Sequence, residues 1–149
     1  VCVAVLAIIS VVVLPIMNSA IDAYAASLSL RRAMERSAFA MERTVILLRD
    51  APEGSSPGTL GITSATATSI VFTDGRGMRL DNGVLYVIQG ATEAPLARNV
   101  TQFSISLVGA DGMNPPATPA ATQRFHVSMT VEGSRLSAIA LARVRGVPG

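Results

Sequence analysis

The first 21 residues of the chain are uncharged and mostly apolar. From Val1 to Met17 the only polar side chains are Cys2 and Ser10, and the first charged residue is Asp22. In a helix, 21 residues span roughly 30 Å, which is about the hydrocarbon thickness of a bilayer. The segment therefore predicts a membrane helix, with Val5, Ile8, Val12 and Pro15 among its apolar positions.

Three interpretations of this segment stay open. It is a membrane helix that remains in place, a secretory signal peptide cleaved near Ala23-Tyr24-Ala25, or a buried helix of a soluble protein. The apolar core of a signal peptide is usually shorter than this run. A buried helix this apolar needs more surrounding protein than the rest of the chain supplies. We favour the first interpretation, and because the chain starts without Met we expect residues upstream of Val1.

The helical pattern continues beyond the apolar run. No Gly or Pro occurs from Ala20 to Asp50, and a loop rich in Pro and Gly follows, so we expect the helix to end near Arg49. Pro15 removes the hydrogen bond to the carbonyl of Val11, which predicts a kink. Apolar residues recur at spacings of four and three, which is typical of one helix face. The face that we expect to pack on the following domain is Met34, Ala38, Met41, Val45 and Leu48.

After residue 50 the hydrophobic pattern changes to a period of two, which is typical of strands. Asn82-Gly83 between two apolar runs predicts a hairpin. We expect residues 114–122 to be an irregular loop without packing capacity, and Ile139 and Leu141 to indicate that both faces of the last strand are covered. No βαβ spacing occurs, so the sheet is expected to be antiparallel. The expected strands are 69–73, 78–80, 84–88, 100–107, 125–131 and 135–143.

These patterns predict an α+β fold, in which a long N-terminal helix packs on an antiparallel β-sheet domain. Residues 1–21 form the membrane half of the helix, residues 22–50 its amphipathic half, and residues 51–149 the sheet domain. The chain of 149 residues is long enough for one such domain with an appendage. The formal net charge of +2 does not indicate the strongly basic surface that nucleic-acid binding requires, so no nucleic-acid partner is expected.

The sequence offers little chemistry for catalysis. His126 is the single histidine and lies in a predicted strand, so we expect a structural role and no catalytic residue, metal or cofactor. Asp74-Gly75, Asp81-Asn82-Gly83 and Asp111-Gly112 are typical of turns, with calcium binding as the less favoured alternative.

A basic cluster lies on the predicted helix at Arg31, Arg32 and Arg36. We expect it to be a solvated helix face. The alternatives are contact with lipid headgroups or a salt bridge to a neighbouring subunit.

A set of short segments is spread over the apolar run with its proline, the long helix and the later strands. These segments are Val13-Leu14-Pro15, Asp22-Ala23-Tyr24, 40–43, 47–50, 78–80, 83–86, 95–97, 99–103 and 110–112. Together they resemble the type IV pilin and type II secretion pseudopilin families, in particular minor pilins and the J-type pseudopilin. The family's basic leader, the Gly before its processing site and its early Glu are not in this sequence, so no residue here is assigned to processing.

The resemblance implies a structural role: a minor pilin or pseudopilin subunit of a type IV pilus or type II secretion filament, and not an enzyme. It implies a single-pass location in the bacterial inner membrane before assembly, with the C-terminal domain in the periplasm or on the assembled filament. The implied partners are other pilin or pseudopilin subunits, inner-membrane lipid, an assembly platform and the prepilin peptidase, with N-terminal methylation. The alternative is a singly membrane-anchored periplasmic binding or sensory domain.

Overall fold

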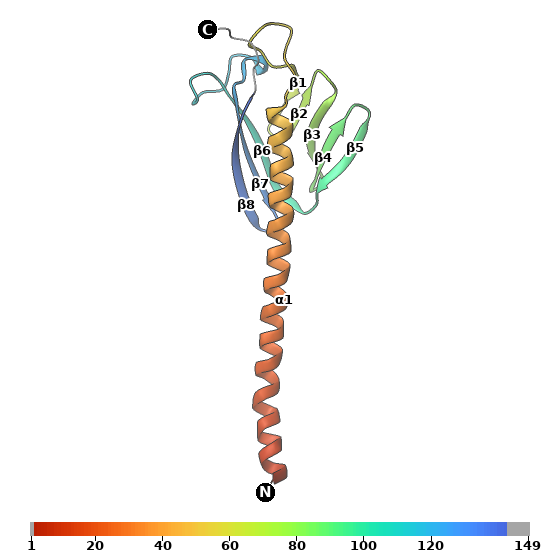
Figure 1. Ribbon diagram of the computed structural model, residues 1–149, viewed down its shortest axis with the longest axis vertical. Coiled ribbons are helices and arrows are strands. Elements are labelled where there is room, and N and C mark those ends of the chain that lie inside the picture. The colour runs from red at the N-terminus through yellow and green to blue at the C-terminus, as the bar shows by residue number, and fades with distance from the viewer. Residues whose placement is uncertain (1, 143–149) are drawn as a thin grey trace. The chain divides into compact units, whose positions relative to one another are not determined.

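A computed structural model describes the backbone of residues 2–142 and the side chains from Leu14 to Ala142 (Figure 1). The chain divides into two compact units, residues 1–35 and residues 36–149. The expected α+β class is confirmed, since the structure contains one long N-terminal helix and antiparallel sheets.

The helix α1 runs from Cys2 to Arg49, which confirms its predicted end. The helical assignment is unbroken through Pro15, whose own side chain is exposed. The side chains of Val5, Ile8 and Val12 lie outside the described ones, so their predicted place in an apolar core stays a prediction.

Within the described residues, the structure contains no helix with enough length and apolar character to cross a membrane. This finding contradicts the predicted single-pass inner-membrane location.

The strands between Ile62 and Leu141 form two antiparallel sheets. The first has the order β1-β2-β3-β4-β5 and the second the order β6-β7-β8. A short 3-10 helix, η1, covers Pro119–Ala121. The strands are β1 (Ile62–Ala65), β2 (Ser69–Phe72), β3 (Arg76–Asp81), β4 (Val84–Gln89), β5 (Thr92–Ala97), β6 (Val100–Val108), β7 (Arg124–Val131) and β8 (Ser134–Leu141).

All six predicted strands are present, and the antiparallel arrangement is confirmed. The predicted hairpin at Asn82-Gly83 joins β3 to β4, and both turn residues have positive φ, at 48° and 74°. A two-residue turn of this kind requires the left-handed region twice, which Asn and Gly tolerate best. β1 and β5 were not predicted, because ITSA and TEAPLA contain small, polar or Pro residues in place of β-branched runs.

One core joins the C-terminal part of α1 to both sheets, which lie on either side of it in Figure 1. Apolar side chains from the helix meet those of the first and the second sheet without a gap in the cluster. The central members are Ala40, Met41 and Leu48 from α1, Ile70, Phe72, Met78 and Leu85 from the first sheet, and Phe103, Phe125, Val127 and Met129 from the second.

The buried face of α1 is rotated relative to the predicted face. Met41 and Leu48 are buried and Val45 is half-buried, as expected, but Ala38 and Met34 are exposed. Ser37 and Thr44 occupy the buried face in their place. The Thr44 hydroxyl donates to the Ala40 carbonyl at 2.8 Å, so its polar group is satisfied within the helix.

The prediction that the loop at residues 114–122 has no packing capacity is wrong. Thr122 is fully buried, and its hydroxyl donates to the Pro119 carbonyl at 2.6 Å. The amide of Leu60 donates to the Ala120 carbonyl at 2.8 Å, so η1 ties this loop to the segment before β1.

A second correction concerns the last strand. Ile139 and Leu141 are 63% and 60% exposed, so the described residues leave the outer face of β8 uncovered at these positions.

Candidate functional site

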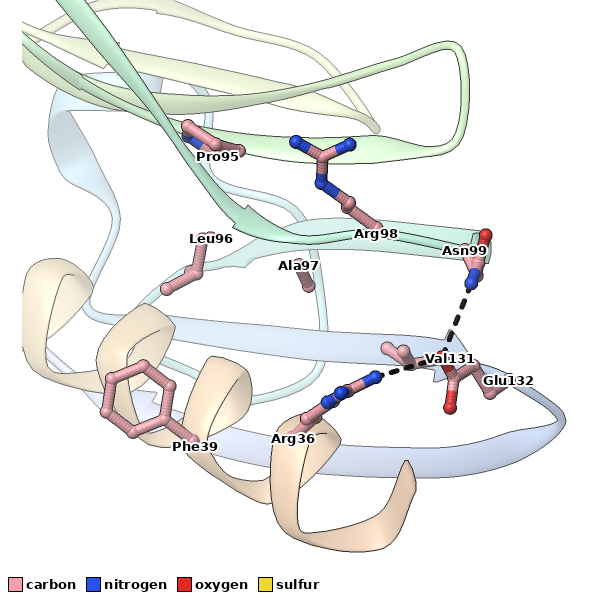
Figure 2. A pocket seen from close by; sticks show the side chains of 9 residues that line it. All are labelled: Arg36, Phe39, Pro95, Leu96, Ala97, Arg98, Asn99, Val131 and Glu132. Carbon is pink, nitrogen blue, oxygen red and sulfur yellow. Dashed lines mark hydrogen bonds and ion pairs between the residues drawn. The ribbon is translucent and has the colours of Figure 1, made fainter. Parts of the chain in front are cut away.

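A cavity of about 430 Å³ lies between α1 and the turn that joins β5 to β6. Figure 2 shows side chains reaching it from the helix, from this turn and from the β7–β8 turn. The cavity is lined by Arg36, Phe39, Pro95, Leu96, Ala97, Arg98, Asn99, Val131 and Glu132.

Glu132 connects the three segments that meet at this cavity. Its Oε1 lies 3.7 Å from the Arg36 Nη1 and accepts a hydrogen bond from the Asn99 Nδ2 at 3.3 Å (Figure 2). The Glu132 amide also donates to the Asn99 carbonyl at 3.2 Å. One residue of the β7–β8 turn therefore contacts both the helix and the β5–β6 turn.

The backbone at the two turns is in an unusual region. Asn99 has φ 57° and Glu132 has φ 49°, and Gly133 follows with φ 83°. Asn tolerates the left-handed region, whereas a Glu there costs roughly 1–2 kcal/mol. Residues held in a costly backbone conformation are common at functional sites, so the position of Glu132 supports the cavity as a functional surface.

A second hollow of about 410 Å³ shares Phe39, Pro95 and Leu96 with the first. Its wall continues along α1 through Arg43 and Ile46, so the helix positions 36, 39, 43 and 46 follow one face at spacings of three and four. We call the two hollows together the helix–β5 groove. Phe39, which is 55% exposed, stands at their common wall.

The charges of the helix–β5 groove are mostly positive. Arg36 pairs with Glu132, and Arg76 pairs with Asp74 and donates to the Asp50 carbonyl at the end of α1 at 2.7 Å. Arg43 and Arg98 have no ion pair among the described residues. An apolar floor flanked by guanidinium groups fits a protein segment that carries apolar and acidic side chains.

Sequence reasoning found only part of this site. Of the predicted basic cluster, Arg36 lines the groove, while Arg31 and Arg32 are exposed helix residues. Phe39 was missed because it lies off the predicted apolar face, although a large aromatic residue in a charged helix segment is itself a signal of a contact surface. Arg98 and Asn99 had no local pattern that indicated their role.

The other residues considered for chemistry lie elsewhere. His126 is exposed on the outer face of the second sheet, in register with Ser106 of β6 and Ile139 of β8. The Asp111 carboxylate accepts hydrogen bonds from the amides of Met113 and Asn114, each at 3.1 Å, and these amides hold the pKa of Asp111 below its ordinary value. The carboxylate oxygens of Asp111 thus accept hydrogen bonds within its own turn.

Comparison of the chain with protein-family models, with curated proteins and with solved structures finds no match. The case for a function therefore depends on the residues themselves.

Replacing Glu132 by asparagine is expected to leave the free energy of unfolding unchanged or to raise it by about 0.5 kcal/mol. Asparagine suits the positive φ at this position, and a partly exposed ion pair contributes only about 0–1 kcal/mol. Chemical denaturation of the two proteins measures the difference. A loss of more than about 1 kcal/mol would show that the contacts of Glu132 stabilise the fold. Its carboxylate would then be explained by stability and would not indicate a functional surface.

Proposed function

We propose that this chain is a pilin-like structural subunit of a filament and that α1 packs against other subunits of the same kind. In this proposal the partners are other pilin or pseudopilin subunits of a type IV pilus or a type II secretion filament. The resemblance of the sequence to these families supports the proposal, as does the α+β layout of a long N-terminal helix followed by antiparallel sheets.

The observation that carries the proposal is the number of large apolar side chains that α1 exposes. Single exposed apolar residues are ordinary on a protein surface, but a contiguous set on one element marks an interaction surface. Each one gains about 1.5–3 kcal/mol when a partner buries it fully. The exposed set on α1 comprises Leu14, Ile16, Met17, Ile21, Tyr24, Leu30, Met34, Phe39 and Ile46.

The distribution of these side chains favours several neighbours over one. Leu14, Met17, Ile21 and Tyr24 follow spacings of three, four and three, which place them on one side of the helix. Ile16, Leu30 and Met34 fall on a different side of the helix, roughly 130° around its axis by the same periodicity. A helix with apolar residues on two sides buries them most fully among several surrounding elements, as in the core of a filament.

A double substitution on one side of α1 tests this proposal. Ile21→Ser with Tyr24→Ser is expected to lower the amount of this chain in sheared extracellular filaments of its host at least 10-fold, because two apolar contacts are lost. The matched control is Ala26→Ser, a small exposed position on the same helix. Immunoblots of filament and whole-cell fractions give the measurement. Equal incorporation of the double variant and the control at equal cellular levels would overturn the proposal.

A further inference from the structure

The outer edge of β8 is a second surface that is suited to binding a partner, because its backbone is free to pair with another strand. β8 pairs with β7 along its whole length, and no other described strand pairs with it. Its eight residues contain no Pro or Gly, and the single charged residue, Arg135, stands near its start. A strand with these properties presents a continuous row of unpaired backbone groups.

The three other edge strands each carry a feature that hinders pairing. β1 has only four residues and a register shift between Ile62 and Ser64. β5 contains Pro95 and has a register shift opposite Leu85 and Tyr86. Proteins commonly protect their edge strands with short length, Pro and bulges of this kind.

The fourth edge, β6, is protected differently. It has a register shift between Val100 and Gln102, and its Ile105 amide donates to the Ala67 carbonyl at 2.8 Å. β8 has neither protection among the described residues, so its edge stands apart from the other three.

The side chains beside this edge are apolar and exposed. Ile139 and Leu141 project from the outer face of β8, and a hollow of about 450 Å³ lies on the helix side of the edge. Val45 and Arg49 of α1 line this hollow together with Ile139 and Leu141. A strand added here would find apolar contacts on both of its faces.

We propose that the partner at this edge is the β8 strand of a second copy of this chain. The two strands would run antiparallel about a two-fold axis and join the three-stranded sheets of both copies into one sheet of six strands.

The sequence of β8 suits antiparallel pairing with a second copy of the same strand. With the axis at Ala138, Arg135 faces Leu141 of the second copy and not another arginine. Leu136 faces Ala140, so a large side chain meets a small one on the inner face. Like charges opposite each other destabilise a strand pair, and this register avoids them.

The hydrogen bonds of β8 support the same register. The Ala142 amide donates to the Gln123 carbonyl at 3.0 Å, so Ala142 and the alternate residues before it direct their backbone groups toward β7. The odd-numbered residues then direct theirs to the free edge. About eight hydrogen bonds form when Arg135 and Ser137 of each copy meet Leu141 and Ile139 of the other.

A cysteine at the axis tests this arrangement directly. Ala138→Cys in a full-length chain with Cys2→Ser is expected to form a disulfide-linked dimer under mild oxidation, because the two side chains at the axis form a close non-hydrogen-bonded pair. The matched control is Ser104→Cys in the same background, on the same sheet but away from the β8 edge. Gel electrophoresis without reductant measures the product. Equal cross-linking of the two variants, or none in either, would overturn the proposal.

A charged side chain introduced at the β8 edge provides a second test of the dimer. Ile139→Lys is expected to lower the dimeric fraction seen by analytical ultracentrifugation at least 10-fold, whereas Ser106→Lys, in the same cross-strand row, is expected to leave it unchanged. Both are made in the chain that carries Ile21→Ser and Tyr24→Ser, so that association through α1 does not contribute. A dimer that survives Ile139→Lys overturns the edge pairing and leaves the proposed function untouched.

Discussion

Replacing Leu48 by alanine is expected to lower the free energy of unfolding by about 3 kcal/mol. Its side chain is fully buried in the cluster that α1 shares with both sheets, so the substitution leaves a cavity in that core. Deletion of a buried leucine costs about 2–5 kcal/mol, with the larger values where the surroundings cannot collapse. The position between two sheets favours a value well inside this range.

The matched control for Leu48 lies two residues away on the same helix. Ile46 is 41% exposed in the helix–β5 groove, and Ile46→Ala removes a similar volume at the same helical depth. We expect this variant to lose no more than about 1 kcal/mol, since 41% of the Ile46 surface stays in water after folding. Urea denaturation followed by circular dichroism measures both variants. Similar losses in the two would contradict the placement of Leu48 in the shared core.

The same pair of variants separates stability from recognition. Leu48→Ala weakens the core but leaves the groove wall in place, whereas Ile46→Ala keeps the core and removes apolar surface from the groove. If the groove receives another subunit, Ile46→Ala lowers incorporation into filaments at nearly unchanged stability. This result would link the helix–β5 groove to the assembly that the exposed residues of α1 support.

The features that the sequence predicted well are local ones. The end of α1 at Arg49 follows from the loop rich in Pro and Gly after it, and the hairpin follows from Asn82-Gly83. Such signals depend on neighbours in the chain and need no knowledge of the fold. The strands β2, β3, β4, β6, β7 and β8 also followed from alternation of apolar and polar residues.

The helix–β5 groove could not be predicted because its parts are far apart in the sequence. Arg36, Asn99 and Glu132 meet only when the helix and two turns are folded together. The missed strand β5 supplies part of the groove wall, so the failure to predict it concealed the site. Pro95 weakened the strand signal, although Pro is well tolerated in an edge strand.

The error in the buried face of α1 has a simple chemical cause. Hydrophobicity alone selected Ala38 and rejected Ser37 and Thr44, but small polar residues fit against a sheet when their hydroxyl groups bond within the helix.

Gly77→Ala is the other substitution for which we expect a large loss, about 3 kcal/mol or more in the free energy of unfolding. Gly77 is buried in β3, between Val71 of β2 and Ile88 of β4. A Cβ atom here would collide with the Ile70 carbonyl oxygen and lie 3.1 Å from the Val71 Cα. Both atoms belong to the backbone of a paired strand, so relief requires that the strands separate, and overpacking of this kind costs about 1–3 kcal/mol or more.

Gly90→Ala is the control that distinguishes collision from backbone conformation. Gly90 has φ 63°, and a Cβ there would meet no atom within 4 Å. Its expected cost of about 1 kcal/mol comes from the left-handed region alone. Guanidinium denaturation of both variants gives the comparison, and a Gly77→Ala loss no larger than that of Gly90→Ala would contradict the close approach of β2 to β3.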